Sequence, residues 1–131
     1  MATAKVNKLR ITKEFGFSAG HYLRGHNHCG KLHGHNYKLF VTIEGEINSS
    51  GFLIDFYELK QIVKGKIIDK LDHPQEGMGL LNDIFPFDPT CENMCIWIFD
   101  ELAKVIDNNR IQLIGVRLYE TDSSYCEYGK F

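Results

Sequence analysis

Hydrophobic and polar residues alternate along the first part of the chain. From Leu9 to His21 the odd positions carry the apolar side chains, with one interruption at Lys13. This period of two predicts a β-strand that ends near His21. Residues 22–32 follow no period and contain two glycines, which indicates a loop.

The same alternation returns after the loop and predicts a second strand. Apolar odd positions run from Tyr37 to Ile43, and His33 and His35 fall in the same odd register. Residues 48–51, Asn-Ser-Ser-Gly, then predict a turn, because each of these residue types favours turn conformations.

Beyond the turn the hydrophobic period lengthens to that of a helix. Asp55 and Glu58 form a capping box ahead of the first helix, and Pro89 and Thr90 open a second one. Residues 72–79, with Pro74 and two glycines, are expected to be the loop between them. The apolar faces consist of Leu59, Ile62, Val63, Ile67, Ile68 and Leu71 in the first helix and Met94, Cys95, Ile98, Leu102, Val105 and Ile106 in the second.

The end of the chain again shows strand patterns. Ile114, Val116 and Leu118 alternate in a third strand, and residues 124–131 form a fourth after the turn in Thr-Asp-Ser-Ser. The order is β-β-α-α-β-β, without internal repeats. It predicts an α+β fold in which both helices cover one face of an antiparallel sheet.

Composition narrows the class of protein. With 131 residues and 44% hydrophobic content, residues 1–131 fit one domain with its own core. We expect a cytoplasmic protein, because there is no secretory signal and no apolar segment of membrane-spanning length. Free thiols are expected for the four cysteines, and a net charge of -2 argues against nucleic acid as a partner.

Three histidines suggest a metal site. His33 and His35 lie two residues apart in a strand and therefore point to one face. If the first two strands pair antiparallel, His21 lies beside them. Three histidines with an open fourth position are typical of catalytic zinc, although iron, copper and nickel also bind imidazole. A histidine pair in a strand is often incidental, and His26 or His28 could replace a ligand if the register were shifted.

Other polar residues near this cluster have two interpretations each. Cys29 is either a base or nucleophile beside the metal or a loop residue without a role. Asp72 and His73 form either a proton relay or a solvated pair. Glu120 continues the apolar register of the third strand, so its carboxylate either needs a buried partner, such as a planar guanidine-like group, or lies at an exposed strand end.

The combined motifs resemble a known family. "FSAGH", "CGKLHGHNY", "GFLIDFYELK", "KLDH", "DPTCEN" and "YETDSSYCEY" are similar, in this order, to motifs of the 6-pyruvoyl-tetrahydropterin synthases and their bacterial branch, the 6-carboxytetrahydropterin synthases of queuosine biosynthesis. The spacing from Cys29 to His35 is more similar to that in the bacterial branch than to that in the animal enzymes. The resemblance implies a tunnelling fold that assembles into a barrel, usually a hexamer of two trimers, with active sites shared between subunits.

The resemblance also implies a role for individual residues. Zn²⁺ would bind His21, His33 and His35; Cys29 would be the proton-abstracting base; and His73 with Asp72 would form the relay. Glu120 would anchor the pterin, supported by Thr90 and Glu92. The implied reaction converts 7,8-dihydroneopterin triphosphate to 6-carboxy-5,6,7,8-tetrahydropterin, with loss of triphosphate and acetaldehyde.

Two alternatives remain open at the level of sequence. The first is 6-pyruvoyl-tetrahydropterin synthase activity of the tetrahydrobiopterin type. The second is a non-catalytic zinc or pterin-binding module, in which Cys29 completes a closed metal site. The chain departs from the family pattern in residues 74–80, which lengthen the loop after His73. The sequence does not show where the triphosphate would bind, and the nearest basic candidates are Arg24, Lys31 and Lys38.

Overall fold

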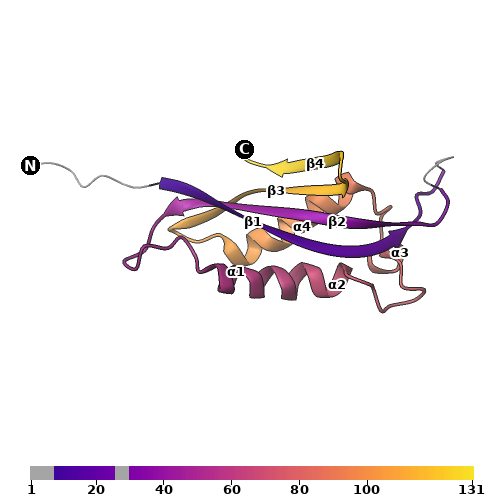
Figure 1. Ribbon diagram of the computed structural model, residues 1–131, viewed down its shortest axis with the longest axis horizontal. Coiled ribbons are helices and arrows are strands. Elements are labelled where there is room, and N and C mark those ends of the chain that lie inside the picture. Colours follow the sequence, from indigo (N-terminus) through magenta and orange to yellow (C-terminus); the bar gives the residue numbers. More distant parts are fainter. Residues whose placement is uncertain (1–7, 26–29) are drawn as a thin grey trace, which may run out of the picture.

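Four antiparallel strands form one sheet in the order in which they occur in the chain. The computed structural model describes residues 8–25 and 30–131 (Figure 1). Its elements are β1 (Lys8–His21), β2 (His33–Glu46), α1 (Phe56–Val63), the π-helical turn η1 (Lys64–Ile68), α2 (Asp69–Leu71), α3 (Leu81–Ile84), α4 (Cys91–Ile106), β3 (Ile111–Thr121) and β4 (Ser124–Gly129).

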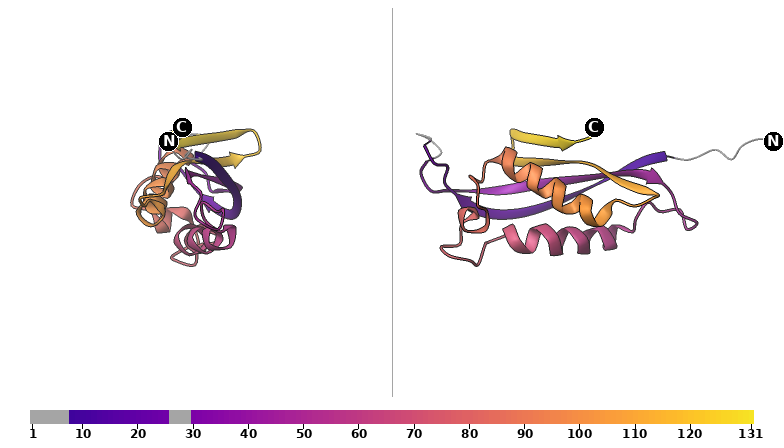
Figure 2. Two further views of the ribbon diagram at one scale, coloured as in Figure 1. Left: turned by 90° about the vertical axis from the view of Figure 1, so that its left-hand side faces the viewer. Right: turned by 180° about the vertical axis from the view of Figure 1, so that it is seen from behind.

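The helices lie on one side of this sheet, as the alternation of side chains predicted. Figure 2 shows them grouped against one face of the strands. The odd-numbered side chains of β2 from Tyr37 to Ile43 face them and are buried, and so are Val116 and Leu118 of β3. These side chains and the apolar faces of the helices form a single core. The central sheet residues of the core are Tyr37, Leu39, Val41, Ile43, Val116 and Leu118.

The first helical segment runs without a break through α1, η1 and α2. Asp55 caps it by accepting a hydrogen bond from the Tyr57 backbone N–H at 2.8 Å, which satisfies a donor in the first turn. Its buried residues recur every four positions, so one stripe of the helix faces the sheet. They are Leu59, Val63, Ile67 and Leu71.

Two details of the sequence prediction were wrong. Val105 is 43% exposed, because the stripe of α4 that faces the sheet runs through Ile98, Leu102 and Ile106. The helix α3 was missed, since its single turn is too short to show a period. In the described part of the chain, no helix combines the length and hydrophobicity that crossing a membrane requires.

The opposite face of the sheet is open and carries polar and aromatic side chains. Phe40, Tyr119 and Tyr125 lie in a row across β2, β3 and β4, with ring centroids 5.7 Å and 4.6 Å apart. Arg117 stacks on Tyr125 and pairs with Glu127 of the neighbouring strand. The two faces of the sheet therefore differ in chemistry: one is a core, and the other is available to solvent or a partner.

Gly45 permits a close approach of β2 to the start of β3. A Cβ atom on Gly45 would lie 2.8 Å from the Cα of Ile111, closer than real Cβ atoms approach backbone. We expect Gly45→Ala to lower the free energy of unfolding by about 1–3 kcal/mol, because the strands must separate. Gly16→Ala is the matched control, since its Cβ would lie at an ordinary 3.6 Å from the Tyr37 carbonyl. Equal urea midpoints for both variants would contradict this interpretation.

Candidate metal centre and active site

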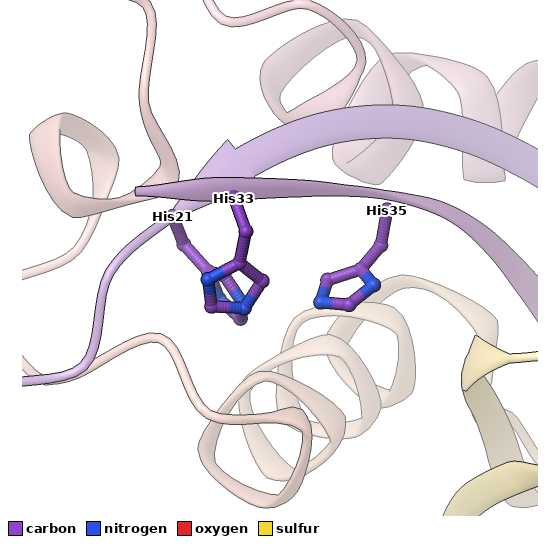
Figure 3. Close-up of side chains that lie close together, drawn as sticks. All are labelled: His21, His33 and His35. Atoms are coloured by element: carbon purple, nitrogen blue, oxygen red, sulfur yellow. The ribbon is translucent and has the colours of Figure 1, made fainter. Parts of the chain in front are cut away.

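Three histidine side chains meet at one end of the β1–β2 ladder. His21 pairs directly with His33, and His35 pairs with Ala19. The three imidazoles project from the same side of the two strands (Figure 3). Their possible ligand atoms all lie within 4.8 Å of one another. The predicted convergence of these residues is confirmed.

Backbone carbonyls determine which ring nitrogens face the cluster. His21 Nδ1 lies 2.8 Å from the Pro89 carbonyl, and His33 Nδ1 lies 2.7 Å from the Lys31 carbonyl. A carbonyl oxygen can only accept a hydrogen bond, so both Nδ1 atoms carry the hydrogen. In the neutral rings both Nε2 atoms are then lone-pair acceptors. They lie 3.0 Å apart.

This arrangement suits a cation. Two acceptors at 3.0 Å repel each other unless a positive charge lies between them. His35 adds a third nitrogen, because its Nε2 is buried and has no hydrogen-bond partner among residues 8–25 and 30–131. Burial lowers the pKa of both His21 and His35, which favours the neutral, ligating form. The donor set therefore fits a divalent transition metal such as Zn²⁺.

Glu120 lies next to the histidines and gives the cluster a carboxylate. Its two oxygens are 3.8 Å from His21 Nε2 and 3.8 Å from His35 Nε2. The pairing of β3 with β4 shifts between Tyr119 and Thr121, at the position of Glu120. The side chain is 27% exposed, so a ligand can reach it from solvent. Glu120 thus has the imidazoles as neighbours and not Arg117, which pairs with Glu127.

Asp72 and His73 lie at the free edge of β1. The Asp72 carboxylate accepts a hydrogen bond from the Ser18 N–H at 2.9 Å, and the His73 N–H donates to the Ser18 carbonyl at 2.8 Å. His73 Nδ1 is 3.0 Å from Asp72 Oδ1, and its backbone has a φ of 46°. The carboxylate and the imidazole are therefore in direct contact, with the Asp72 carboxylate fixed by the Ser18 N–H.

Within one chain this pair does not belong to the histidine cluster. His73 borders a cavity of about 320 Å³ together with Gly20, Gly34 and Asn36, and His35 of the histidine cluster also lines it. The metal-site side chains point to the helix-covered face of the sheet. Since Gly20 and Gly34 have no side chain, the cavity reaches down to the backbone of β1 and β2. His35 is therefore the one residue of the cluster that lines this cavity with His73, and neither His21 nor His33 lines it.

The remaining predicted site residues have varied positions. Thr90 is the N-cap of α4, and its hydroxyl accepts from the Asn93 N–H at 3.0 Å, so this group already has a structural partner. Glu92 is exposed in the first turn of the helix. Cys29 and the alternative ligands His26 and His28 lie outside the described residues.

The basic residues considered for the triphosphate are surface side chains. Arg24 lies 3.6 Å from Asp88, and Lys38 lies 3.9 Å from Asp122. Lys31 is exposed, and its carbonyl orients His33. These residues do not form one cluster with the histidines.

Sequence reasoning missed the groups that support the ligands. The contact of His21 with the Pro89 carbonyl could not be predicted, because the two residues are far apart in the sequence and a backbone carbonyl leaves no trace in the pattern of side chains. Asn82 of α3 binds the backbone of Tyr22 in two places, accepting from its N–H at 3.0 Å and donating to its carbonyl at 2.9 Å. These two hydrogen bonds fix the backbone immediately after His21.

Metal binding can be tested by comparing a variant of His33 with a variant of His73 as the control. We expect one zinc per chain in the wild type and a loss of at least tenfold in zinc affinity in His33→Ala, because one of three ligands is removed. His73→Ala should keep wild-type affinity, since its ring is not one of the three candidate ligands. Competition with a chromophoric chelator measures both values. Equal losses in the two variants would contradict the three-histidine site.

Comparisons with known proteins identify the family of this chain. A model of the family described as "6-pyruvoyl tetrahydropterin synthase" matches residues 10–130. The chain is 36% identical over 140 residues to a 6-carboxy-5,6,7,8-tetrahydropterin synthase of Haemophilus influenzae, covering 91% of this chain and 97% of the relative. It is also 36% identical over 99 residues to a 6-pyruvoyl tetrahydrobiopterin synthase of Pongo abelii, covering 73% of this chain and 65% of the relative.

The fold is shared with solved structures. The 6-pyruvoyl tetrahydropterin synthase of Caenorhabditis elegans superposes with a TM-score of 0.80, at 24% identity, covering 97% of this chain and 99% of that one. The antiparallel sheet with its helices is therefore a tunnelling fold, as the sequence resemblance implied. Together, the motifs, the match across nearly the whole chain and the shared architecture show that this chain belongs to the 6-pyruvoyl tetrahydropterin synthase family.

Proposed function

We propose that this protein is a zinc-dependent 6-carboxytetrahydropterin synthase of queuosine biosynthesis. It would convert 7,8-dihydroneopterin triphosphate to 6-carboxy-5,6,7,8-tetrahydropterin and release triphosphate and acetaldehyde. The observation that carries the proposal is the convergence of three imidazoles beside Glu120, with Nδ1–H of His21 and His33 held by carbonyls. Such a site holds a metal with three protein ligands and leaves room for substrate.

The described residues supply binding and orientation. Zinc held by His21, His33 and His35 would polarise oxygen atoms on the substrate side chain and so acidify neighbouring C–H bonds. Glu120 would accept two parallel hydrogen bonds from the guanidine-like edge of the pterin, for which its partial exposure leaves space. Because Glu120 and the histidines are neighbours, the pterin ring and its side chain would be oriented together.

Proton transfer is assigned to Cys29 and to the pair of Asp72 and His73. The role of Cys29, as the base that removes a proton from the substrate side chain, rests on the sequence motif alone. The Asp72 carboxylate lies 3.0 Å from Nδ1 of His73, whose side chain is 75% exposed and therefore accessible. Because the pair does not belong to the histidine cluster of its own chain, it would serve an active site shared with another subunit.

A homo-oligomer is part of the same proposal. β1 and β4 are the two edge strands of the sheet, and an edge strand can pair with another chain. The open face also carries the exposed aromatic Tyr125, which suits contact with a second copy. We propose a hexamer of two trimers, in which several chains close the sheet into a barrel.

Two other functions compete with this proposal. The relative from Pongo abelii supports 6-pyruvoyl-tetrahydropterin synthase activity, which would share the metal site and differ in the fate of the side chain. A non-catalytic zinc or pterin-binding module would use Cys29 as a fourth ligand and leave no open position. Metal content alone does not separate these functions, whereas the products and the effect of Cys29 do.

Product analysis tests the reaction. Incubation of the zinc-loaded protein with 7,8-dihydroneopterin triphosphate should release triphosphate, acetaldehyde and 6-carboxytetrahydropterin, identified by mass spectrometry. Cys29→Ala should lower turnover by a factor of roughly 100 or more, as expected for loss of a general base, and retain its zinc.

The possible outcomes separate the three functions. A pyruvoyl product would assign the tetrahydrobiopterin-type activity. Absence of triphosphate release, with zinc lost from Cys29→Ala, would assign the closed binding module. Cys95→Ser provides a cysteine control in the hydrophobic core, and its turnover should match the wild type.

The role of Glu120 can be measured separately. Glu120→Gln keeps the shape of the side chain and removes its charge, so we expect kcat/KM to fall roughly 10- to 150-fold, the equivalent of about 1.5–3 kcal/mol for a hydrogen bond to a charged group. Zinc content should not change. Glu127→Gln, on the neighbouring strand and paired with Arg117, is the matched control. If Glu120→Gln loses its zinc and Glu127→Gln does not, Glu120 is a metal ligand and not a pterin anchor.

A further inference from the structure

Two cysteine thiols are in direct contact beside the candidate site. Cys91 lies in the first turn of α4, and Cys126 lies on β4 opposite Leu118 of β3. Their sulfur atoms are 3.2 Å apart. The Cys126 thiol also lies 3.2 Å from the Cys91 carbonyl, and the Cys91 thiol 3.2 Å from the Leu118 carbonyl. Both residues are free cysteines and half-buried.

The packing of α4 on the strands explains this contact. Cys91 and Cys95 are four residues apart and therefore share one face of the helix. Cys126 points to that face from the end of the sheet. Cys95 is fully buried, and its sulfur lies 3.7 Å from the Cys126 carbonyl and 3.8 Å from the Val116 carbonyl. Its thiol is directed toward backbone acceptors, which leaves Cys91 and Cys126 as the pair.

We propose that Cys91 and Cys126 form a redox-active dithiol that a peroxide converts to an intramolecular disulfide. The sulfur atoms must approach by only about 1 Å to reach the S–S bond length of about 2.0 Å. In the first step one thiolate attacks hydrogen peroxide, giving a sulfenic acid and hydroxide. The other thiol then displaces the sulfenic oxygen as water, so that two thiols are oxidised and one peroxide is reduced to two waters.

The surroundings of the two thiols make this reaction slow. The hydrogen bond with Cys126, burial and the Glu120 carboxylate all raise the pKa of Cys91. The hydrogen bond with Cys91 lowers the pKa of Cys126, but its hydrogen bond with Cys95, burial and the charge of Glu92 raise it, to about 12. The thiolates are therefore scarce at neutral pH.

The disulfide would join two supports of the metal site. Cys91 is two residues from Pro89, whose carbonyl orients His21. Cys126 pairs with Leu118, which is two residues from Glu120. Oxidation would hold the start of α4 against the β3–β4 hairpin at this point. Since the bond closes a long segment of chain, the oxidised form should also resist thermal unfolding better than the reduced form.

Peroxide treatment of the full-length, zinc-loaded protein tests the proposal. We expect a species lighter by two hydrogen atoms, in which the tryptic peptides that contain Cys91 and Cys126 are linked, with a raised Tm and unchanged zinc content. Dithiothreitol should reverse the link. Cys95→Ser is the matched control, because residues 71–104 form one tryptic peptide with two cysteines. This variant should form the same link, and Cys126→Ser should form none.

Other results would overturn the proposal. A link that disappears in Cys95→Ser would assign the pair to Cys95 and Cys126. Free thiols at both Cys91 and Cys126 after Cys29 has been oxidised would show that the buried pair does not react. Sulfinic acid at either residue, which dithiothreitol does not reverse, would show that the second thiol cannot reach the first. None of these results depends on the proposed enzymatic activity.

Discussion

The pairing register of β1 and β2 is the constraint on which the rest of the site depends. Because His21 lies directly opposite His33, three imidazoles reach one face at the same end of the ladder. Side chains alternate between the faces of a sheet, so a slip of one residue would move one strand's histidines to the other side. The buried odd positions of β2, such as Leu39 and Val41, oppose any such slip because they would have to become exposed.

Hydrogen bonds to backbone carbonyls convert this cluster of rings into a set of ligands. The Pro89 and Lys31 carbonyls hold the Nδ1 side of two histidines, so that lone pairs on Nε2 face each other. The metal-free arrangement contains repulsion between acceptors and a buried nitrogen of His35 without a partner in the described part of the chain. A bound cation removes both costs. The free energy of binding a metal would thus compensate an arrangement that the fold imposes.

The candidate catalytic groups lie in two places on the sheet. The histidines and Glu120 belong to the side that carries the core and helices, while His73 lies at the free edge of β1 and borders a cavity that His35 also lines. Gly34 serves both sides, because it separates two ligands on one face and leaves the other face bare. An active site that used all of these groups, as proposed above, would need more than one copy of the chain.

The sequence by itself determined the order and type of the main elements and the inward face of the strands, and it pointed to the three histidines of the candidate metal site, because these depend on short periods and spacings. For Glu120, which continues an apolar register, it left open a buried partner or an exposed strand end. Only the tertiary structure showed that the partner is the imidazole cluster, that Val105 points outward and that α3 exists. It also revealed the orienting carbonyl of Pro89 and the contact of Cys91 with Cys126. These features arise where segments far apart in the chain pack together, and no local pattern of residues encodes such contacts.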